Sequence, residues 1–229
     1  MRVVKPYKGI GMEGMLATWY ARNTAKLKAD FASCARRIAA RLPERADILE
    51  VAPGPGYLAI ELARLGPYRV TGLDISRSFV HLARDNAAQA GVEIDFRQGD
   101  AAAMPFAAQS LDFVVCRAAF KNFSNPAGAL AEMHRVLRPG GEALVIDMRN
   151  ETTDTEIDAA IDEMHLDRLN AFVNRMIFKH MLRKRAYRCR DFQDMVAATP
   201  FGQADIEIGS IGFEARLTKL AEASIGSRS

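Results

Sequence analysis

DILEVAPGPGYLAIELAR (residues 47–64) is the stretch of this sequence that decides its fold. Residues 48–51 have the apolar character of a buried strand, and the Pro-Gly repeat at 53–56 cannot continue it. From Tyr57 onward, apolar residues return at helical spacing. Glycines let a ligand approach the backbone closely, and a helix N-terminus offers N–H groups and the positive end of the helix dipole. The stretch therefore predicts a strand, a turn and a helix that together bind a nucleotide-like or carboxylate group.

Two patterns overlap in this turn. Gly54, Gly56 and Ala59 satisfy the dinucleotide pattern G-x-G-x-x-A. Glu50, Ala52, Gly54 and Gly56 also fit a second pattern, in which an acid ends the strand and Ala takes the first of three glycine positions. The turn alone leaves both interpretations open, and the acids further along the chain have to decide between them.

Two more acids follow predicted strands. Asp74 ends a second predicted strand at 68–73, at about the interval after Gly56 where an acid meets ribose hydroxyls in nucleotide-binding α/β folds. Asp100 follows a third predicted strand at 92–97. A nicotinamide enzyme would explain Gly54 and Asp74 but neither Glu50 nor Asp100, and no Tyr-x-x-x-Lys pair occurs in the sequence. Alternating strands and helices predict a parallel sheet, whose ligands lie at the carboxyl ends of its strands.

The second pattern, together with EMHRVLRPGG at 132–141, resembles the class I S-adenosylmethionine-dependent methyltransferases. Its closest likeness is to the branch that methylates quinones and small natural products. The resemblance covers roughly residues 45–149. It implies an α/β fold with a doubly wound, mostly parallel, seven-stranded sheet and an antiparallel last strand. An N-terminal helical cap and a helical lid inserted after strand five complete the expected fold.

The resemblance also assigns cofactor contacts to particular residues. Glu50 would meet the amino end of the methionine part, and Gly54 and Gly56 would bring backbone N–H groups to it. Asp74 would take the ribose hydroxyls, and Asp100 with Ala101 the adenine edge. All predicted contacts to S-adenosylmethionine are Tyr20, Glu50, Ala52, Gly54, Gly56, Asp74, Ile75, Asp100, Ala101 and Arg117.

We expect one methyltransferase domain in four parts. The helical cap covers 1–45, the cofactor-binding core 46–150, the lid 151–190, and a C-terminal helix with the closing strand pair 191–229. The lid carries a predicted apolar stripe, which consists of Ile157, Ile161, Met164, Phe172, Met176 and Met181. Methionines suit an adaptable apolar pocket. A helix that merely packs on the core, or a dimer interface, would explain the stripe as well.

The sequence identifies the methyl acceptor less well than the cofactor. Predicted acceptor contacts are Lys121, Asn122, Met164, Phe172 and Met176. If the acceptor must lose a proton near neutral pH, histidine is the natural base. His165 and His180 lie on or beside the stripe and are the two catalytic candidates. No metal site is predicted.

Composition limits the remaining possibilities. The 229 residues carry a net charge of +3, which is too slight to indicate a nucleic-acid partner. Three cysteines without framework spacing fit reduced thiols in the cytoplasm. No apolar run approaches a membrane span. The basic segment 175–190 fits a solvated helix end, an anionic substrate or an acidic membrane surface.

These observations predict an enzyme that transfers a methyl group from S-adenosylmethionine to a small, partly apolar acceptor, with O-, C- or N-methylation left open. The alternatives are a non-methylating enzyme on the same fold and a regulatory protein that binds the cofactor. Whether the chain forms a homodimer is also left open.

Overall fold

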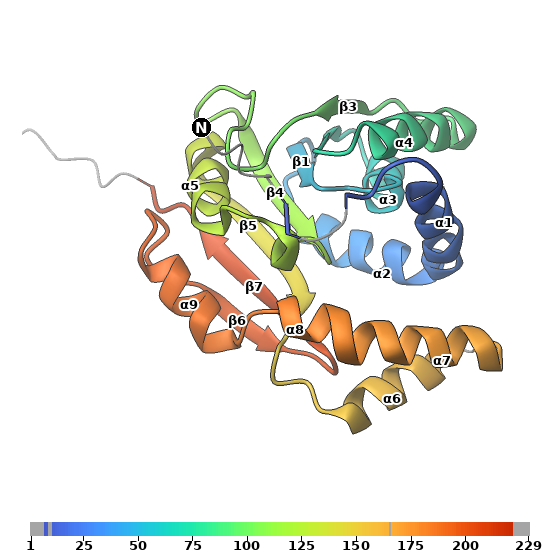
Figure 1. The fold of residues 1–229 in the computed structure, drawn as a ribbon. Coiled ribbons are helices and arrows are strands. Elements are labelled where there is room, and N and C mark those ends of the chain that lie inside the picture. The colour runs from blue at the N-terminus through green and yellow to red at the C-terminus, as the bar shows by residue number, and fades with distance from the viewer. Residues whose placement is uncertain (1–6, 9–10, 165, 222–229) are drawn as a thin grey trace, which may run out of the picture.

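A seven-stranded sheet runs through the molecule in the order β3-β2-β1-β4-β5-β7-β6 (Figure 1). The computed structural model describes residues 7–8, 11–164 and 166–221. Strands β1 to β5 are parallel, and β7 lies antiparallel between β5 and β6, so the predicted fold class is confirmed. The strands are β1 (Asp47–Val51), β2 (Arg69–Asp74), β3 (Asp95–Gln98), β4 (Leu111–Arg117), β5 (Leu137–Met148), β6 (Asp205–Ile208) and β7 (Gly212–Thr218).

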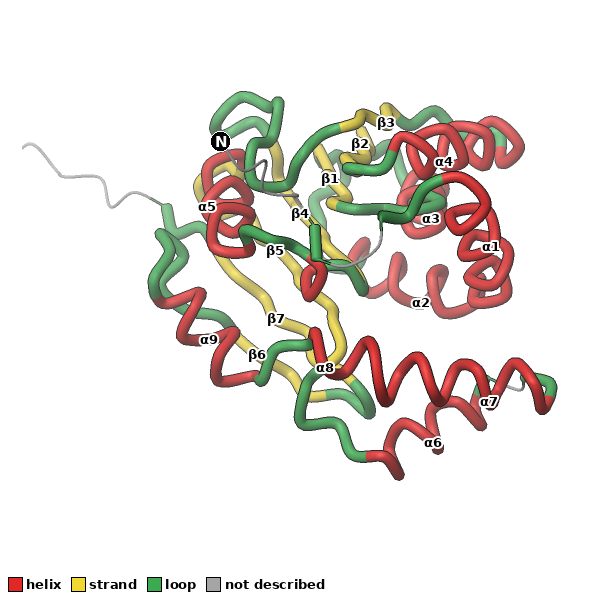
Figure 2. Tube along the Cα trace, viewed as in Figure 1, coloured by secondary structure: helices red, strands yellow, loops and turns green. Residues whose placement is uncertain are grey.

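Helices cover both faces of the central strands (Figures 1 and 2). Val114 and Cys116 of β4 pack in one core cluster with α5 and α9, while Phe113 and Val115 pack in a second cluster with α2, α3 and α4. A strand buried on both faces needs a continuous apolar run, which β4 has. The helices that flank the sheet are α2 (Lys28–Ala39), α3 (Tyr57–Leu65), α4 (Arg77–Ala90), α5 (Pro126–Val136) and α9 (Cys189–Ala197).

The third strand is shorter than the predicted 92–97. It begins only at Asp95. Gly91 ends α4 in the left-handed conformation with φ +68°, and the Val92 N–H donates to the Ala87 carbonyl at 3.1 Å. The backbone at Val92 therefore caps the helix instead of joining the sheet.

The insertion after β5 is helical, as predicted. It contains α6 (Asp154–Glu163), α7 (Arg168–Ile177), a π-helical turn (Phe178–Leu182) and the short α8 (Arg183–Arg185). Ile157 and Ile161 of α6 are buried in a third core cluster with Met148 and Ala186.

The predicted apolar stripe is therefore not one surface. Met164 packs partly buried against the third cluster, whereas Phe172, Met176 and Met181 are 61%, 46% and 45% exposed. The stripe divides because α6 buries Ile157 and Ile161 in the third cluster, whereas α7 has no buried residue. In the described part of the chain, no helix is long and apolar enough to cross a membrane.

Candidate functional site

The glycine-rich turn joins β1 to α3 at the carboxyl edge of the sheet. Gly54 and Gly56 have φ of +55° and +81°, a region that favours glycine. A Cβ on Gly56 would lie 2.8 Å from the Phe96 ring, so no other residue fits there. Ala52 also has a positive φ, +55°, which costs a non-glycine residue ~1 kcal/mol. Backbone strain of this kind often marks a functional site.

Asp74, at the end of β2, holds this turn in place through hydrogen bonds. Its carboxylate accepts hydrogen bonds from the Gly54 N–H at 3.0 Å and the Ser76 N–H at 2.8 Å. Burial raises the pKa of Asp74 to about 6, although these backbone hydrogen bonds oppose the shift. The Gly56 N–H donates to the Pro53 carbonyl at 3.0 Å. Both glycine N–H groups that were expected to reach the methionine part are thus engaged within the protein in this arrangement.

Glu50 lies at the end of β1 and is only 3% exposed. Its Oε2 is buried and has no hydrogen-bond partner among the residues that the structure describes. Burial raises the pKa of Glu50 to about 8, and the Ala59 N–H and the Arg117 charge only partly oppose that shift. An unsatisfied buried carboxylate oxygen is costly. A bound amino group would satisfy it, so the acid fits the amino end of S-adenosylmethionine.

Tyr20, on α1 (Gly14–Thr24), covers the turn. Its ring comes within 3.9 Å of the place where a Cβ on Gly54 would stand. The ring also packs edge-on against Phe79 with 5.7 Å between centroids. Burial raises the pKa of the Tyr20 hydroxyl. The structure therefore brings Tyr20 to the glycine turn.

Glu13, just before α1, connects the start of α1 to the start of α4 through hydrogen bonds. The Glu13 carboxylate accepts from the backbone N–H groups of Arg77 and Ser78, both at 3.1 Å, and from the Ser78 hydroxyl at 2.5 Å. Burial alone would raise the pKa of Glu13, but these hydrogen bonds hold it below its usual value. Sequence analysis missed Glu13, because its partners lie 64 and 65 residues away.

The adenine-side candidates lie together after β3. The Ala102 N–H donates to Asp100 Oδ1 at 2.9 Å, which shapes the turn that holds Ala101. The Gly99 N–H donates to the Asp74 carbonyl at 2.9 Å, and the Gln98 side chain donates to the Ile75 carbonyl at 3.3 Å. The segments that follow β2 and β3 are therefore tied together.

Arg117 links the end of β4 to the helical cap. Its guanidinium forms an ion pair with Asp30 of α2 and lies 4.5 Å from the centroid of the Phe31 ring. Its charge acts on both Glu50 and Tyr20. Arg117 therefore holds α2 beside the site.

Lys121 follows β4 and is enclosed. Its Nζ donates to Asp147 Oδ1 at 2.7 Å and to the Ala118 carbonyl at 2.6 Å, and its side chain is 4% exposed. In this arrangement its ammonium group is not available to an acceptor. Sequence analysis missed Asp147. It lies near the end of β5, and the argument that selected the acids at the ends of β1, β2 and β3 applies to it as well.

The neighbouring Asn122 has a buried Oδ1 without a partner in the described chain. Its carbonyl accepts from the Lys8 N–H at 2.7 Å, so residues 7–8 cross this loop.

The structure describes only one of the two catalytic candidates. His165 lies outside the described residues. His180 is exposed in the π-helical turn. Phe172 and Met176 are exposed on α7, and Met164 is partly buried.

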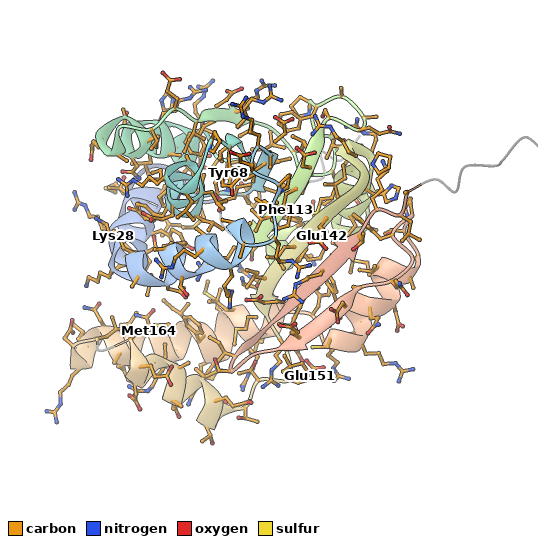
Figure 3. All side chains as sticks on the ribbon, turned by 180° about the vertical axis from the view of Figure 1, so that it is seen from behind. Lys28, Tyr68, Phe113, Glu142, Glu151 and Met164 are labelled. Carbon is orange, nitrogen blue, oxygen red and sulfur yellow. The ribbon has the colours of Figure 1, made fainter. Side chains whose placement is uncertain are left out.

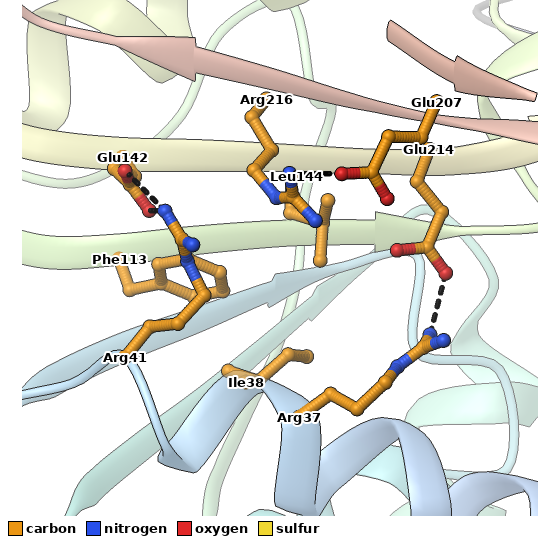
Figure 4. A pocket seen from close by; sticks show the side chains of 9 residues that line it. All are labelled: Arg37, Ile38, Arg41, Phe113, Glu142, Leu144, Glu207, Glu214 and Arg216. Atoms are coloured by element: carbon orange, nitrogen blue, oxygen red, sulfur yellow. Dashed lines mark hydrogen bonds and ion pairs between the residues drawn. The ribbon is translucent and has the colours of Figure 1, made fainter. Parts of the chain in front are cut away.

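A pocket away from the glycine-rich turn is a weaker candidate for ligand binding (Figure 4). It lies against β4, β5 and β7 beside α2, and three arginines line it. Each arginine is paired with a glutamate of the same pocket: Arg37 with Glu214, Arg41 with Glu142, and Arg216 with Glu207. The pocket therefore presents no unmatched charge to a ligand. Among the described residues, no group of three His, Cys, Asp or Glu side chains could hold a metal ion.

Comparison with known proteins shows which families this chain is similar to. Residues 49–145 match the family model of the methyltransferase domain. The chain is 39% identical over 101 residues to a demethylmenaquinone methyltransferase of Deinococcus radiodurans, covering 44% of this chain and 42% of that protein. It is 38% identical over 103 residues to a ubiquinone/menaquinone biosynthesis C-methyltransferase of Bdellovibrio bacteriovorus, covering 44% and 43%. The match thus spans less than half the length of these curated relatives.

Solved structures show the same fold. A protein of Methanococcus maripaludis described as an S-adenosylmethionine-dependent methyltransferase superposes with a TM-score of 0.76 at 21% identity, covering 95% of this chain and 98% of that one. The [4+2]-cyclase SpnF superposes with a TM-score of 0.56 at 19% identity, covering 83% and 81%.

Proposed function

Because residues 49–145 match the family model of the methyltransferase domain and the sheet has the strand order described above, we propose that this chain transfers a methyl group from S-adenosylmethionine to a small, partly apolar acceptor. The observation that carries the proposal is the unsatisfied Glu50 carboxylate beside the strained turn at Ala52 and Gly54. When bound, the cofactor supplies a methyl group activated by a sulfonium.

The residues of this chain then bind and orient. We assign the amino end of the methionine part to Glu50, the ribose hydroxyls to Asp74, and the adenine edge to Asp100 and Ala101, with Ile75 against the adenine face. Tyr20 covers the turn and excludes water. Catalysis of this kind depends on positioning and on a water-poor site.

The acceptor is proposed from two sources. The names of the relatives, demethylmenaquinone methyltransferase and ubiquinone/menaquinone biosynthesis C-methyltransferase, suggest an aromatic, partly apolar molecule. The exposed Phe172 and Met176 offer apolar surface for such a molecule. We assign Met164, Phe172 and Met176 to the acceptor pocket and Asn122 to its polar side. His165 and His180 remain the proposed bases if a proton must leave.

A second function is supported by one finding. The [4+2]-cyclase SpnF shares this fold, so a non-methylating enzyme remains the alternative. A regulatory protein that binds the cofactor without turnover is the third. We place the chain in the cytoplasm on account of its three free cysteines, and a homodimer would be visible in its mass in solution.

Calorimetry with S-adenosylmethionine, followed by mass spectrometry of products, tests the proposal. The donor carries a labelled methyl group, and a panel of reduced aromatic quinones serves as acceptors. We expect cofactor binding and a labelled product. Failure to bind the cofactor, or tight binding of NAD instead, would overturn the assignment. Binding with an unlabelled rearranged product would favour the alternative enzyme, and binding without any product the regulatory protein.

A further inference from the structure

Exposed apolar side chains gather on two helices. Of the eleven large apolar side chains that are exposed in the described part, eight lie on α1 or on the run from α7 through the π-helical turn. They are Met15, Leu16, Trp19, Leu169, Phe172, Val173, Met176 and Met181. Single exposed apolar residues are ordinary, but a concentration of this kind marks an interaction surface.

The exposed residues of α7 form one face. Leu169, Val173, Met176, His180 and Lys184 follow one another at intervals of three or four residues and are all exposed. The opposite side of the helix packs on α6, where Ala171, Phe178 and Leu182 join the third core cluster. The π-helical turn accommodates Met181 within the exposed run. The apolar face therefore continues into the basic end of the helix.

The charge on this segment has one sign. From Arg168 to Arg190 the sequence contains eight basic residues and no acid. Arg175, Lys179 and Arg183 form ion pairs with aspartates of α6, on the packed side. The remaining five form no ion pair in the described structure: Arg168, Lys184, Arg185, Arg188 and Arg190.

The helical cap carries further exposed cations. Figure 3 places Lys28, at the start of α2, above Met164 at the end of α6. Lys28, Lys26 and Arg22 are exposed, and none forms an ion pair within the described residues.

We propose that α7, the π-helical turn and α8 form a docking surface for an anionic lipid bilayer. An amphipathic helix with large apolar side chains on one face and cations beside them lies in the interface of such a membrane. Its cations are attracted to acidic headgroups. A second copy of the chain fits less well, because a symmetric contact through this face would bring the unpaired cations of both copies together.

The surface would bring Phe172 and Met176 to the lipid. If the proposed function holds, an apolar acceptor could then pass from the bilayer to the acceptor pocket without crossing water. Binding to lipid itself needs neither cofactor nor acceptor, so its test is independent of the proposed reaction.

Vesicle flotation tests the proposal with the full chain. We expect binding to vesicles with about 30% phosphatidylglycerol, little binding to pure phosphatidylcholine, and release at about 0.5 M NaCl. The double variant Lys184→Glu/Arg188→Glu should weaken binding by roughly tenfold or more. Arg36→Glu/Arg45→Glu makes the same change in charge at exposed positions outside this surface, on α2 and in the bend before β1, and should bind as the wild type does. Leu169→Ser tests the apolar contribution and should also weaken binding.

Three results would overturn the proposal: equal binding to both kinds of vesicle, an equal loss in the two double variants, or a dimer in solution that Leu169→Ser dissociates. Circular dichroism of each variant shows that the fold is retained.

Discussion

Glu50 makes the cofactor site sensitive to pH at the scale of a single residue. Burial raises its pKa to about 8, so at neutral pH the free protein holds it largely protonated. Only the ionised form carries the charge that would meet the ammonium group of the cofactor. Affinity for S-adenosylhomocysteine should therefore rise between about pH 6 and 9, and Glu50→Gln should flatten that rise. Calorimetry over this pH range measures both curves, and parallel curves would contradict the role of Glu50.

The same shift has a consequence for stability. Between the usual value of 4.5 and about 8, the folded protein holds a proton on Glu50 that the unfolded chain has released. The unfolded state binds fewer protons in this window, so the free energy of unfolding should fall as pH rises through it. Urea titrations of the free protein should show this fall, and Glu50→Gln should remove it.

Asp74 combines a binding role with a structural one. Asp74→Ala should weaken cofactor binding by roughly ten- to hundredfold, because a charged acceptor of this kind contributes ~1.5–3 kcal/mol. It also leaves the N–H groups of Gly54 and Ser76 without their acceptor, so the free energy of unfolding should fall without loss of the fold. Asp95→Ala, which removes an exposed ion pair with Arg97, is the control and should leave affinity unchanged. Unaltered calorimetry for Asp74→Ala would exclude its ribose role.

At the scale of elements, Glu13 holds α1 against α4. Removal of a helix cap typically costs ~0.5–2 kcal/mol. Glu13→Ala should release the start of α1 and with it Tyr20, so bound S-adenosylhomocysteine should dissociate faster, by roughly tenfold. Stopped-flow fluorescence measures this rate. Glu44→Ala changes an exposed acid before β1 and should dissociate like the wild type. If Glu13→Ala also dissociates at the wild-type rate, α1 does not control the release of the ligand.

The helix α7 carries the acceptor prediction. Met176→Glu places a charge on its exposed face and should abolish acceptor turnover while S-adenosylhomocysteine still binds normally. Ile208→Glu, on the exposed edge strand β6, is the matched control. If the variant loses both its fold and cofactor binding, Met176 only supports the core. If turnover stays normal, Met176 does not contact the acceptor.

Elements were predictable where the signal was local. The strands β1, β2 and β4 and the glycine turn depend on neighbouring residues, so the sequence predicts these elements. It also places Glu50 and Asp74 at the ends of β1 and β2. The Glu13 contact and the pairing of Lys121 with Asp147 join residues far apart in sequence, and no local pattern reports them. The division of the apolar stripe depends on how α6 packs against α7, which helical spacing alone does not determine.

At the scale of the whole molecule, stability should be uneven. The central strands lie between two large core clusters, whereas the third cluster, against which α6 and α7 pack, contains four buried residues. Amide hydrogen exchange should therefore be faster in residues 154–185 than in β1 and β4. Ile161→Ala should accelerate exchange in that region and leave β4 unchanged. Uniform acceleration across the chain would show that the region unfolds together with the core.

The antiparallel position of β7 between β5 and β6 has a consequence during synthesis. Met148 pairs with Gly212 and Glu142 with Thr218, so 64 to 76 residues separate the partners. A ribosome adds roughly 5–20 residues per second, so several seconds pass before the partner of β5 has been translated. For that time the nascent chain carries a strand with an open hydrogen-bonding edge, the kind of edge that joins other chains. We therefore expect the growing polypeptide to associate with other chains most readily after β5 has left the ribosome and before β7 has been translated.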